Sequence, residues 1–437
     1  MSTSRRDFIR SSMGVCLAAG AGISAAAPTL AARAAQRSRP RSLLILGGTA
    51  FIGPHIIDAA RAAGYEVTIF NRGVTEVRTQ RPIDGVEKIV GDRDPDKGDG
   101  LKNLEARIKE KGGWDAVIDT SGYYPRMVKA SAELLAPVVG QYIFISSISV
   151  YADHTQPDMD ESAPVGTIDD PTVEEMGPGY ANYGPLKALC EQAVEAALPG
   201  RACNVRPGFI VGPGDPTDRF TYWPVRFDKG GEVLVPGTPD DPMQFIDVRD
   251  LARWLVHLVE KRTMGVFNAT GPVGGCTVGN FVKACQAAAS SPSTPVYVDA
   301  DFLENQGLGG GVVTILIPNR GDAAGFHRRS IARAVVAGFT SRPVEQTVKD
   351  TLAWWPGEVE RRVRVTRDIL ASAEEENAKL RAEGKEEKPL PRMADPEKLR
   401  AGLDPEREAA ILTAYRERAA SAPEGAERGS DTRNDQR

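Results

Sequence analysis

Short apolar runs alternate with helical patterns through residues 42–206 of the 437-residue chain. Apolar runs bounded by glycine or polar residues are typical of buried parallel strands, and apolar residues at helical spacing are typical of amphipathic helices. The expected strands are residues 42–46, 66–70, 87–90, 116–118, 142–145 and 203–206, and the expected helices include 52–63, 101–111, 127–135 and 179–198. Strands that alternate with helices predict right-handed crossovers and a doubly wound parallel sheet with both faces covered.

This regular alternation ends after Pro207. Proline, glycine and aspartate become frequent as far as Pro242, and strands (244–246, 266–268) and helices (251–260, 278–289, 329–337, 344–355) return in pieces. We therefore expect an α/β fold in which a smaller substrate lobe, residues 211–356, is interleaved with a first domain of residues 40–210. Residues 357–420 are highly charged and predict a helical extension, with helices at 358–380 and 405–419, and residues 421–437 are typical of a disordered tail.

The first 34 residues resemble an export signal rather than a part of the fold. Arg5 and Arg6 precede an apolar residue, Phe8, as in twin-arginine signals. A weakly apolar stretch follows as far as Leu30, and Ala32-Arg33-Ala34 matches a small-x-small cleavage site. We expect residues 1–34 to engage the twin-arginine export machinery, to direct the protein to the periplasm and to be removed, which leaves no stable membrane span. An uncleaved membrane anchor is the alternative.

The composition narrows the class of protein. A net charge of -5 argues against a protein whose main work is binding the phosphates of nucleic acid. The five cysteines and four histidines form no Cys-x-x-Cys motif and no close cluster, so we expect no metal site.

The segment from Gly47 to Gly53 lies between the first expected strand and the first expected helix. Small residues at such a turn let the backbone approach a pyrophosphate, and the helix N-terminus supplies N–H donors, so residues 40–210 are expected to bind a dinucleotide. The second strand ends at Asn71 and Arg72, where NAD-binding sites usually carry an acid. Arg72 suits a 2′-phosphate and favours NADP, and a solvated Arg72 with NAD is the alternative. Asp92 closes the third strand and can reach the adenine amine, or it serves only the turn.

A serine and a Tyr-x-x-x-Lys pair form the candidate catalytic set. Ser147 follows the fifth strand, and Tyr183 and Lys187 lie four residues apart, on one face of a helix. A free phenol has a pKa of about 10, and lowering it by about three units takes roughly 4 kcal/mol. One ammonium about 4 Å away supplies about that much at an effective dielectric of about 20. We therefore expect Lys187 to lower the pKa of Tyr183 and to hold the nicotinamide ribose, while Tyr183 moves a proton and Ser147 positions the substrate oxygen.

These motifs resemble the extended short-chain dehydrogenase/reductase superfamily, in its NAD-dependent epimerase/dehydratase group, over residues 42–355. The resemblance implies a doubly wound nucleotide domain, a small C-terminal substrate domain, hydride transfer at a carbinol carbon and a homodimer. Two departures are Ala50, in place of the usual middle glycine, and Asn71, in place of the usual acid. With the resemblance, the residues expected to bind the cofactor are Gly47, Thr49, Ala50, Phe51, Ile52, Gly53, Asn71, Arg72, Asp92, Arg93, Ser121, Lys187 and Pro207.

The resemblance implies a sugar-like substrate but argues against a nucleotide sugar. Met243 stands where the related nucleotide-sugar enzymes carry an arginine for the pyrophosphate, which favours a free sugar, a glycoside or another polyol. The loop after the sixth strand offers Arg219, Tyr222 and Trp223 as candidate substrate-binding residues. A structured loop with core aromatics is the alternative.

The sequence thus predicts an exported NAD- or NADP-dependent oxidoreductase or epimerase that acts on a secondary alcohol or ketone of a small molecule. Because free nicotinamide nucleotides are expected to be scarce outside the cytoplasm, we expect the cofactor to stay bound and to be recycled within each catalytic cycle. Two alternatives stay open, a net NADP-dependent reductase and a non-catalytic RNA- or ligand-binding protein of the same fold.

Overall fold

The computed structural model of this chain describes residues 41–421. The expected twin-arginine signal at residues 1–34 lies outside the described residues. So does the expected tail, apart from Ser421, which is the last residue of a helix.

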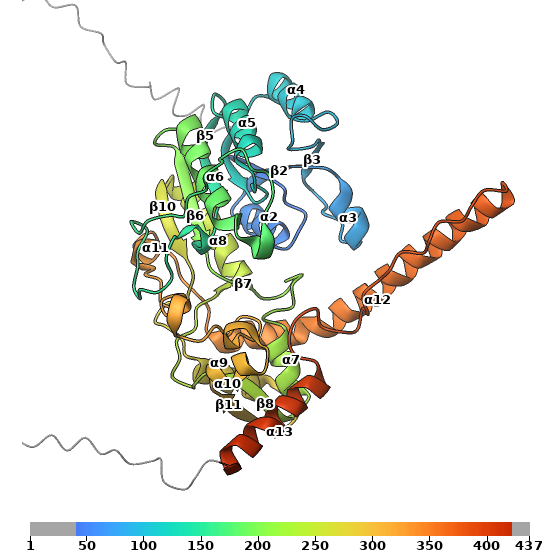
Figure 1. The fold of residues 1–437 in the computed structure, drawn as a ribbon. Helices are drawn as coiled ribbons and strands as arrows, with labels where there is room; N and C mark the ends of the chain where they lie inside the picture. The colour runs from blue at the N-terminus through green and yellow to red at the C-terminus, as the bar shows by residue number, and fades with distance from the viewer. Residues whose placement is uncertain (1–40, 422–437) are drawn as a thin grey trace, which may run out of the picture. The chain divides into compact units, whose positions relative to one another are not determined.

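A seven-stranded parallel sheet forms the centre of the first lobe (Figure 1). Its strand order is β10-β6-β5-β4-β1-β2-β3, so the direction of winding reverses between β1 and β4. In this register Leu46 pairs with Phe70 of β2 and with Asp119 of β4, which aligns the carboxyl ends of the strands. The strands are β1 (Arg41–Leu46), β2 (Tyr65–Asn71), β3 (Glu87–Val90), β4 (Trp114–Asp119), β5 (Val139–Ile145), β6 (Ala202–Pro207) and β10 (Gly265–Ala269). This order confirms the predicted doubly wound sheet, and ligands of such sheets bind at the reversal point.

Helices cover both faces of this sheet because successive strand residues point to opposite sides and nearly all of them are apolar. On one face, Ile45 and Ile118 pack under α2 (Ile52–Ala62) and α8 (Val248–Lys261). On the other face, Leu44 and Val117 pack under α5 (Pro125–Leu135) and α6 (Tyr183–Ala197). The remaining elements of this lobe are α3 (Val74–Thr79), α4 (Lys102–Lys111), α11 (Ala332–Val336) and the short 3-10 helices η1 (Ile148–Val150) and η2 (Pro178–Tyr180).

A second lobe has its own apolar core, centred on Trp223, Phe227 and Phe281. Its elements are α7 (Tyr222–Asp228), β8 (Gly231–Pro236), α9 (Val278–Ala288), β11 (Ser293–Val298), α10 (Ala300–Asn305), η3 (Gly309–Gly311) and η4 (Gly321–Ala323). β8 and β11 pair in parallel. Where the lobes join, β7 (Ile210–Val211) pairs with β9 (Ile246–Asp247), and the chain then returns through α8 to place β10 at the edge of the first sheet.

The charged C-terminal residues form two helices that pack on the lobes. α12 runs unbroken over Val344–Ala382 and includes Pro356, where two separate helices were expected. Proline removes one helical hydrogen bond, but the buried contacts of Glu358 and Arg362 hold the chain helical beyond it. α13 (Pro405–Ser421) lies along β8 and α7 and buries Ile411 and Leu412 in the core of the second lobe (Figure 1). The extension is therefore helical, as predicted, and its second helix completes a core that the 211–356 segment leaves open.

No helix within residues 41–421 is both long and apolar enough to cross a bilayer.

Candidate active site

The turn between β1 and α2 requires glycine at three positions. Gly47 and Gly48 have φ values of 100° and 84°, which residues with a side chain rarely adopt. A Cβ atom on Gly53 would lie 2.3 Å from the backbone of Gly48, so the turn closes only without a side chain there. Within the described residues, no side chain caps the N-terminus of α2. Free N–H donors beside a bare glycine backbone fit the pyrophosphate of a dinucleotide.

The other residues of this turn differ in their surroundings. Thr49 is buried and Ala50 is exposed. Phe51 and Ile52 line a cleft of about 280 Å³ at the carboxyl edge of the sheet, and Pro207 lines the same cleft from the end of β6. Phe51, Ile52 and Pro207 thus line the same cleft as the candidate catalytic residues.

Asn71 locks the end of β2 to this turn. Its side-chain amide donates to the Gly47 carbonyl (3.1 Å), and its side-chain oxygen accepts from the Gly73 amide (2.7 Å). The neighbouring Arg72 is exposed and has no hydrogen-bond or ion-pair partner in the part of the chain that the structure describes. Asp92 accepts from the Asp94 amide (2.9 Å) in a turn at the end of β3. Arg72 therefore keeps its full hydrogen-bonding capacity at the edge where the adenosine end of a dinucleotide would lie.

Arg93 does not face the cofactor site, which corrects the sequence-based assignment. Both of its terminal amino groups bond to the fully buried carboxylate of Asp119, and it also donates to Ser121 Oγ (3.1 Å) and Ser131 Oγ (2.9 Å). Burial pushes the pKa of Asp119 up, but the charge of Arg93 outweighs it and holds that pKa below its usual value. The physical reason for the correction is that a carboxylate buried in β4 needs a cation. Ser121 stays beside Gly47, where an added Cβ would lie 3.3 Å from the serine Cβ.

The structure brings Ser147, Tyr183 and Lys187 together in the wall of the same cleft. Ser147 follows β5, caps η1 and donates to Ser149 Oγ (3.1 Å), and its hydroxyl lies near enough to Tyr183 to lower the pKa of that phenol. Tyr183 and Lys187 occupy the first two turns of α6, so their side chains lie on one face of that helix. An oxygen acceptor, a phenol and an ammonium thus meet at the carboxyl edge of the sheet.

Lys187 does not act on Tyr183 in the way the sequence suggested. Its ammonium is buried and donates to the carbonyls of Gly122 (2.7 Å) and Ile145 (2.6 Å), and burial lowers its pKa to about 8. Burial raises the pKa of Tyr183 above its ordinary value, and the nearby Ser147 hydroxyl and the charge of Arg219 oppose that rise. Arg219, and not Lys187, is therefore the nearby cation whose charge opposes the rise in the pKa of Tyr183.

Of the three candidate substrate residues, only Arg219 lines the cleft. Tyr222 and Trp223 are at most 2% exposed and belong to the second lobe's core, where Trp223 Nε1 donates to Thr314 Oγ1 (2.8 Å). Their assignment to the substrate is therefore corrected to a packing role. Both residues lie in the first turn of α7 and point into the core, where their large apolar side chains are buried. Met243 is also buried in this core.

The sequence analysis missed several cleft residues, among them two phenylalanines. Phe209 lies just after β6, and Phe326 comes from a loop far along the chain, and both line the cleft with their rings 5.5 Å apart. Phe209 lies two residues after Pro207, which the sequence analysis assigned to the cofactor site, and this proximity is a signal that could have found it. Phe326 lies in a stretch without helix or strand periodicity, so only the tertiary structure places it.

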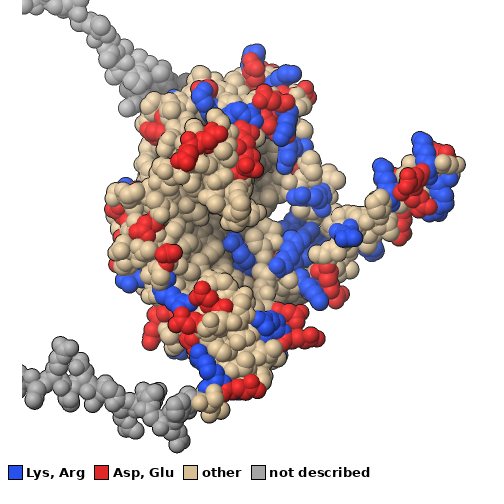
Figure 2. Space-filling view, in the orientation of Figure 1, with Lys and Arg blue, Asp and Glu red and all other residues tan. Residues whose placement is uncertain are grey.

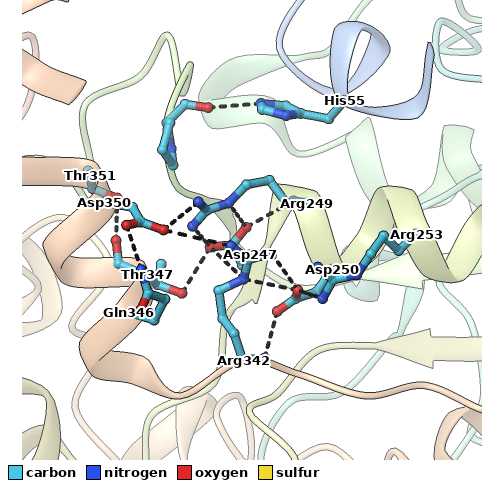
Figure 3. A network of polar contacts seen from close by, with 11 residues as sticks. His55, Asp247, Arg249, Asp250, Arg253, Arg342, Gln346, Thr347, Asp350 and Thr351 are labelled. Carbon is cyan, nitrogen blue, oxygen red and sulfur yellow. Dashed lines mark hydrogen bonds and ion pairs between the residues drawn. The ribbon is translucent and has the colours of Figure 1, made fainter. Parts of the chain in front are cut away.

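A network of charged side chains joins the start of α8 to the start of α12 (Figure 3). Asp247 at the start of α8 bonds to Arg249 (2.7 Å) and to Thr347 Oγ1 of α12 (2.9 Å), and Arg342 bonds to Asp250 (2.8 Å). Above them, His55 of α2 hydrogen-bonds to the Pro213 carbonyl (3.0 Å). Of these contacts, the His55 hydrogen bond holds the loop that leads to Arg219 against α2, the helix that follows the phosphate turn.

A second set of charges ties α12 to both lobes. Arg362 forms two hydrogen bonds with the buried carboxylate of Asp218 (2.8 and 2.6 Å). One turn earlier, Glu358 pairs with Arg81, which follows α3 in the first lobe. Figure 2 shows basic side chains gathered on this face where α12 passes the first lobe.

Comparison with known proteins places this geometry in a family. The model of the NAD dependent epimerase/dehydratase family matches residues 43–269, slightly more than half of the chain. Among curated proteins, the chloroplast stem-loop binding protein of 41 kDa b from Arabidopsis thaliana is 28% identical over 277 residues. That match covers 59% of this chain and 66% of the relative, just under two thirds of its length. The epimerase family protein SDR39U1 of Bos taurus is 26% identical over 266 residues, covering 57% of this chain and 81% of the relative.

Solved structures share the fold. The Bordetella bronchiseptica enzyme WbmG in complex with NAD and UDP superposes with a TM-score of 0.53 at 15% identity. The match covers 74% of this chain and 96% of that enzyme, and it shows a shared fold alone.

Proposed function

Because this chain belongs to the NAD dependent epimerase/dehydratase family, we propose that it is an exported oxidoreductase or epimerase acting at a secondary alcohol or ketone of a sugar-like molecule. The observation that carries the proposal is the meeting of Ser147, Tyr183 and Lys187 in one cleft beside the glycine turn. Hydroxyl, phenol and ammonium at the carboxyl edge of a doubly wound sheet suit proton transfer at a carbinol oxygen.

Each residue has a distinct part in this reaction. Ser147 holds the substrate oxygen, and Tyr183, which lines the same cleft, takes the proton from an alcohol or returns it to a ketone. Lys187, held by the Gly122 and Ile145 carbonyls, keeps a third N–H for the ribose hydroxyls of the nucleotide. When bound, NAD or NADP supplies a nicotinamide ring that accepts and returns the hydride.

We propose NADP as the preferred nucleotide on the basis of Arg72. Its guanidinium is exposed and without a partner among residues 41–421, and it follows the strand whose end lies near the adenosine ribose. A guanidinium binds a phosphate monoester in two-point fashion, whereas NAD offers no phosphate at this position. NAD remains the alternative, because Asn71 leaves room for either nucleotide.

We also propose that the protein works in the periplasm with a retained nucleotide. The support is the twin-arginine pattern around Arg5 and Arg6, since this route exports folded proteins. A retained nucleotide must be oxidised and reduced within one cycle, as in an epimerase.

The first experiment is to purify the protein from the exported fraction, denature it and identify the released nucleotide by mass and absorbance. One NADP or NAD per chain is the expected result. An empty site that binds either nucleotide weakly would contradict the retained cofactor and favour a net NADP-dependent reductase, which consumes added nucleotide in proportion to product.

A second experiment tests the reacting centre. Tyr183→Phe removes the proton donor and acceptor but no charge that holds the nucleotide, so turnover should fall by about 10²- to 10⁴-fold with nucleotide content unchanged. Turnover is followed as reduction of the bound nucleotide by a panel of sugars and polyols. Tyr180→Phe, at a 71% exposed tyrosine three residues earlier, is the matched control and should keep wild-type turnover. Loss of turnover and nucleotide together in Tyr183→Phe would count against the assignment.

RNA binding is a second candidate, because one relative is named a stem-loop binding protein. The net charge of -5 opposes it, and the complete Ser/Tyr/Lys set in a cleft favours the enzyme. Filter binding of stem-loop RNA over a salt series separates the two, because phosphate binding weakens steeply with salt.

A further inference from the structure

Arg219 presents an oriented guanidinium to the cleft that holds Ser147 and Tyr183. Its Nε donates to Thr217 Oγ1 (3.1 Å), and the guanidinium lies 5.1 Å from the centre of the Phe209 ring. These contacts fix the plane of the group but leave both terminal amino groups unused. Within residues 41–421, no acceptor bonds to them. An arginine held in this way can bind a ligand with little further loss of side-chain entropy.

The nearest carboxylates are committed elsewhere. Asp218, the preceding residue, is fully buried and bonded to Arg362 of α12 and to the Arg400 amide (2.9 Å). Asp215 accepts from the amide and the hydroxyl of Thr217 (2.8 and 2.7 Å). Burial raises the pKa of Asp215, which weakens it as a counter-charge. Asp215 lines the same cleft and interacts with Arg219 through space, but no carboxylate within residues 41–421 forms an ion pair with Arg219.

Arg219 also lies near the reacting centre, because it lines the same cleft as Ser147 and Tyr183, and its charge acts on the Tyr183 phenol. A group bound to Arg219 would thus sit close to the carbon whose oxygen Tyr183 serves. The cleft is small, because its volume of about 280 Å³ falls just below the range of about 300–1,000 Å³ that is typical of ligand sites. Phe51, Ile52, Lys187 and Pro207, which are assigned to the nucleotide, form part of its wall. Phe209 and Phe326 make another part of the wall apolar.

We propose that Arg219 binds an oxyanion of the substrate, so that the substrate is a small anionic secondary alcohol, such as a sugar acid or a sugar phosphate. This rests on the proposed function and narrows its substrate class. The two parallel N–H groups of the guanidinium match the oxygens of a carboxylate or a phosphate and discriminate against a neutral polyol of the same size. The oxyanion also forms the ion pair with Arg219 that no carboxylate within residues 41–421 forms.

The test compares matched sugars with the nucleotide-loaded protein. D-glucose, D-glucuronate and D-glucose 6-phosphate, and the corresponding galactose series, differ only in the presence and kind of the oxyanion. Binding is measured by isothermal titration, and turnover by reduction of the bound nucleotide. We expect an acid or a phosphate to bind about 10- to 100-fold more tightly than its neutral partner, the gain typical of hydrogen bonds to a charged group. The acid and phosphate arms tell which oxyanion is preferred.

Arg219→Met should abolish that preference and leave the bound nucleotide in place. Arg219→Lys keeps the charge without the two-point geometry and should recover part of the preference. Arg328→Met, at an exposed arginine in the loop after Phe326, is the control and should keep the wild-type preference. Equal or weaker binding of every anion compared with its neutral partner overturns the proposal, and so does an anion preference that survives in Arg219→Met.

These outcomes separate this proposal from the proposed function. An anion preference that depends on Arg219, with no reduction of the nucleotide by any sugar, supports the oxyanion site and contradicts the oxidoreductase. Reduction of the nucleotide by neutral sugars alone supports the oxidoreductase and overturns the oxyanion site.

Discussion

The charges that join the two lobes and the charges in the cleft are of the same residue types, but their surroundings differ. Around Asp247 and Asp250, each carboxylate has an arginine partner, with Arg249 and Arg342 closing the set (Figure 3). In the cleft, Lys187 bonds only to carbonyls, and Arg219 leaves two amino groups unused.

Adjacent residues show the contrast most clearly. Asp218 faces inward and is neutralised by Arg362, whereas Arg219 faces the cleft and has no carboxylate partner among the described residues. A buried ion pair holds two segments together only when each charge is matched. An unmatched charge in a cavity is stable only with water or a ligand. Whether a charged residue has a partner, rather than its residue type, therefore distinguishes the charges that hold the lobes together from the charges that can bind a ligand.

The largest expected effect comes from breaking a matched pair. Arg362→Met leaves the fully buried Asp218 carboxylate without its cation, which should lower the free energy of unfolding by about 3–5 kcal/mol. The measurement is a urea titration of both proteins. Arg367→Met, at an exposed arginine on the next turns of α12, should change stability by no more than about 0.5 kcal/mol.

The double variant Asp218→Leu/Arg362→Met removes both charges and should regain much of the loss. Equal stability of Arg362→Met and Arg367→Met would mean that the Asp218–Arg362 pair does not hold the extension to the lobe. It would contradict the idea that paired buried charges stabilise the contact between the segments they join.

The next effect concerns the unmatched Lys187 and depends on pH. Its folded-state pKa is lowered to about 8 from an ordinary 10.5, so the unfolded chain binds more protons between these two pH values. The free energy of unfolding of the wild type, relative to Lys187→Met, should therefore rise with pH from about 8 to about 10.5. At 1.36 kcal/mol per unit the rise amounts to about 3 kcal/mol.

Thermal or urea unfolding at stepped pH values measures this difference. The same subtraction with Lys129→Met, at an exposed lysine on α5, should be flat over that range. A flat difference for Lys187→Met as well would show that its ammonium keeps its ordinary proton affinity and lies in a more polar setting than the structure gives it.

The smallest effect is at the exposed edge of the nucleotide site. Arg72→Ser should weaken NADP binding by about 10-fold, the loss of one charge-assisted contact, and leave NAD binding unchanged. Nucleotide titration of the stripped protein gives both constants, and Arg78→Ser in α3 serves as the control. An equal loss for both nucleotides would indicate that Arg72 contacts a part that they share.

Local patterns predicted the centre of the first lobe well. A buried parallel strand needs a continuous apolar run, so β1, β2 and β5 were recognised within one to three residues of their ends. The turn from Gly47 to Gly53 was recognised from its glycines, which the structure requires because a Cβ atom on Gly53 would lie 2.3 Å from the backbone of Gly48. Ser147, Tyr183 and Lys187 were found because their spacing relative to a strand and a helix is a property of the chain itself. The prediction that Lys187 lowers the pKa of Tyr183 was wrong, because spacing does not show that its ammonium bonds to two carbonyls.

The sequence by itself thus determined the doubly wound sheet, the phosphate turn and the identity of the candidate catalytic set, because each depends on residues close together in the chain. Only the tertiary structure decided which charges are matched. Arg93 is unavailable to the cofactor because it pairs with the buried Asp119, 26 residues away in the chain. Arg219 has no carboxylate partner among the described residues, since the neighbouring Asp218 pairs instead with Arg362, 144 residues away on α12. Tyr222 and Trp223 face inward for the same reason, since the core that receives them is built from α9 and α13. Pairing and burial depend on distances between remote segments, and the folded chain alone sets those distances.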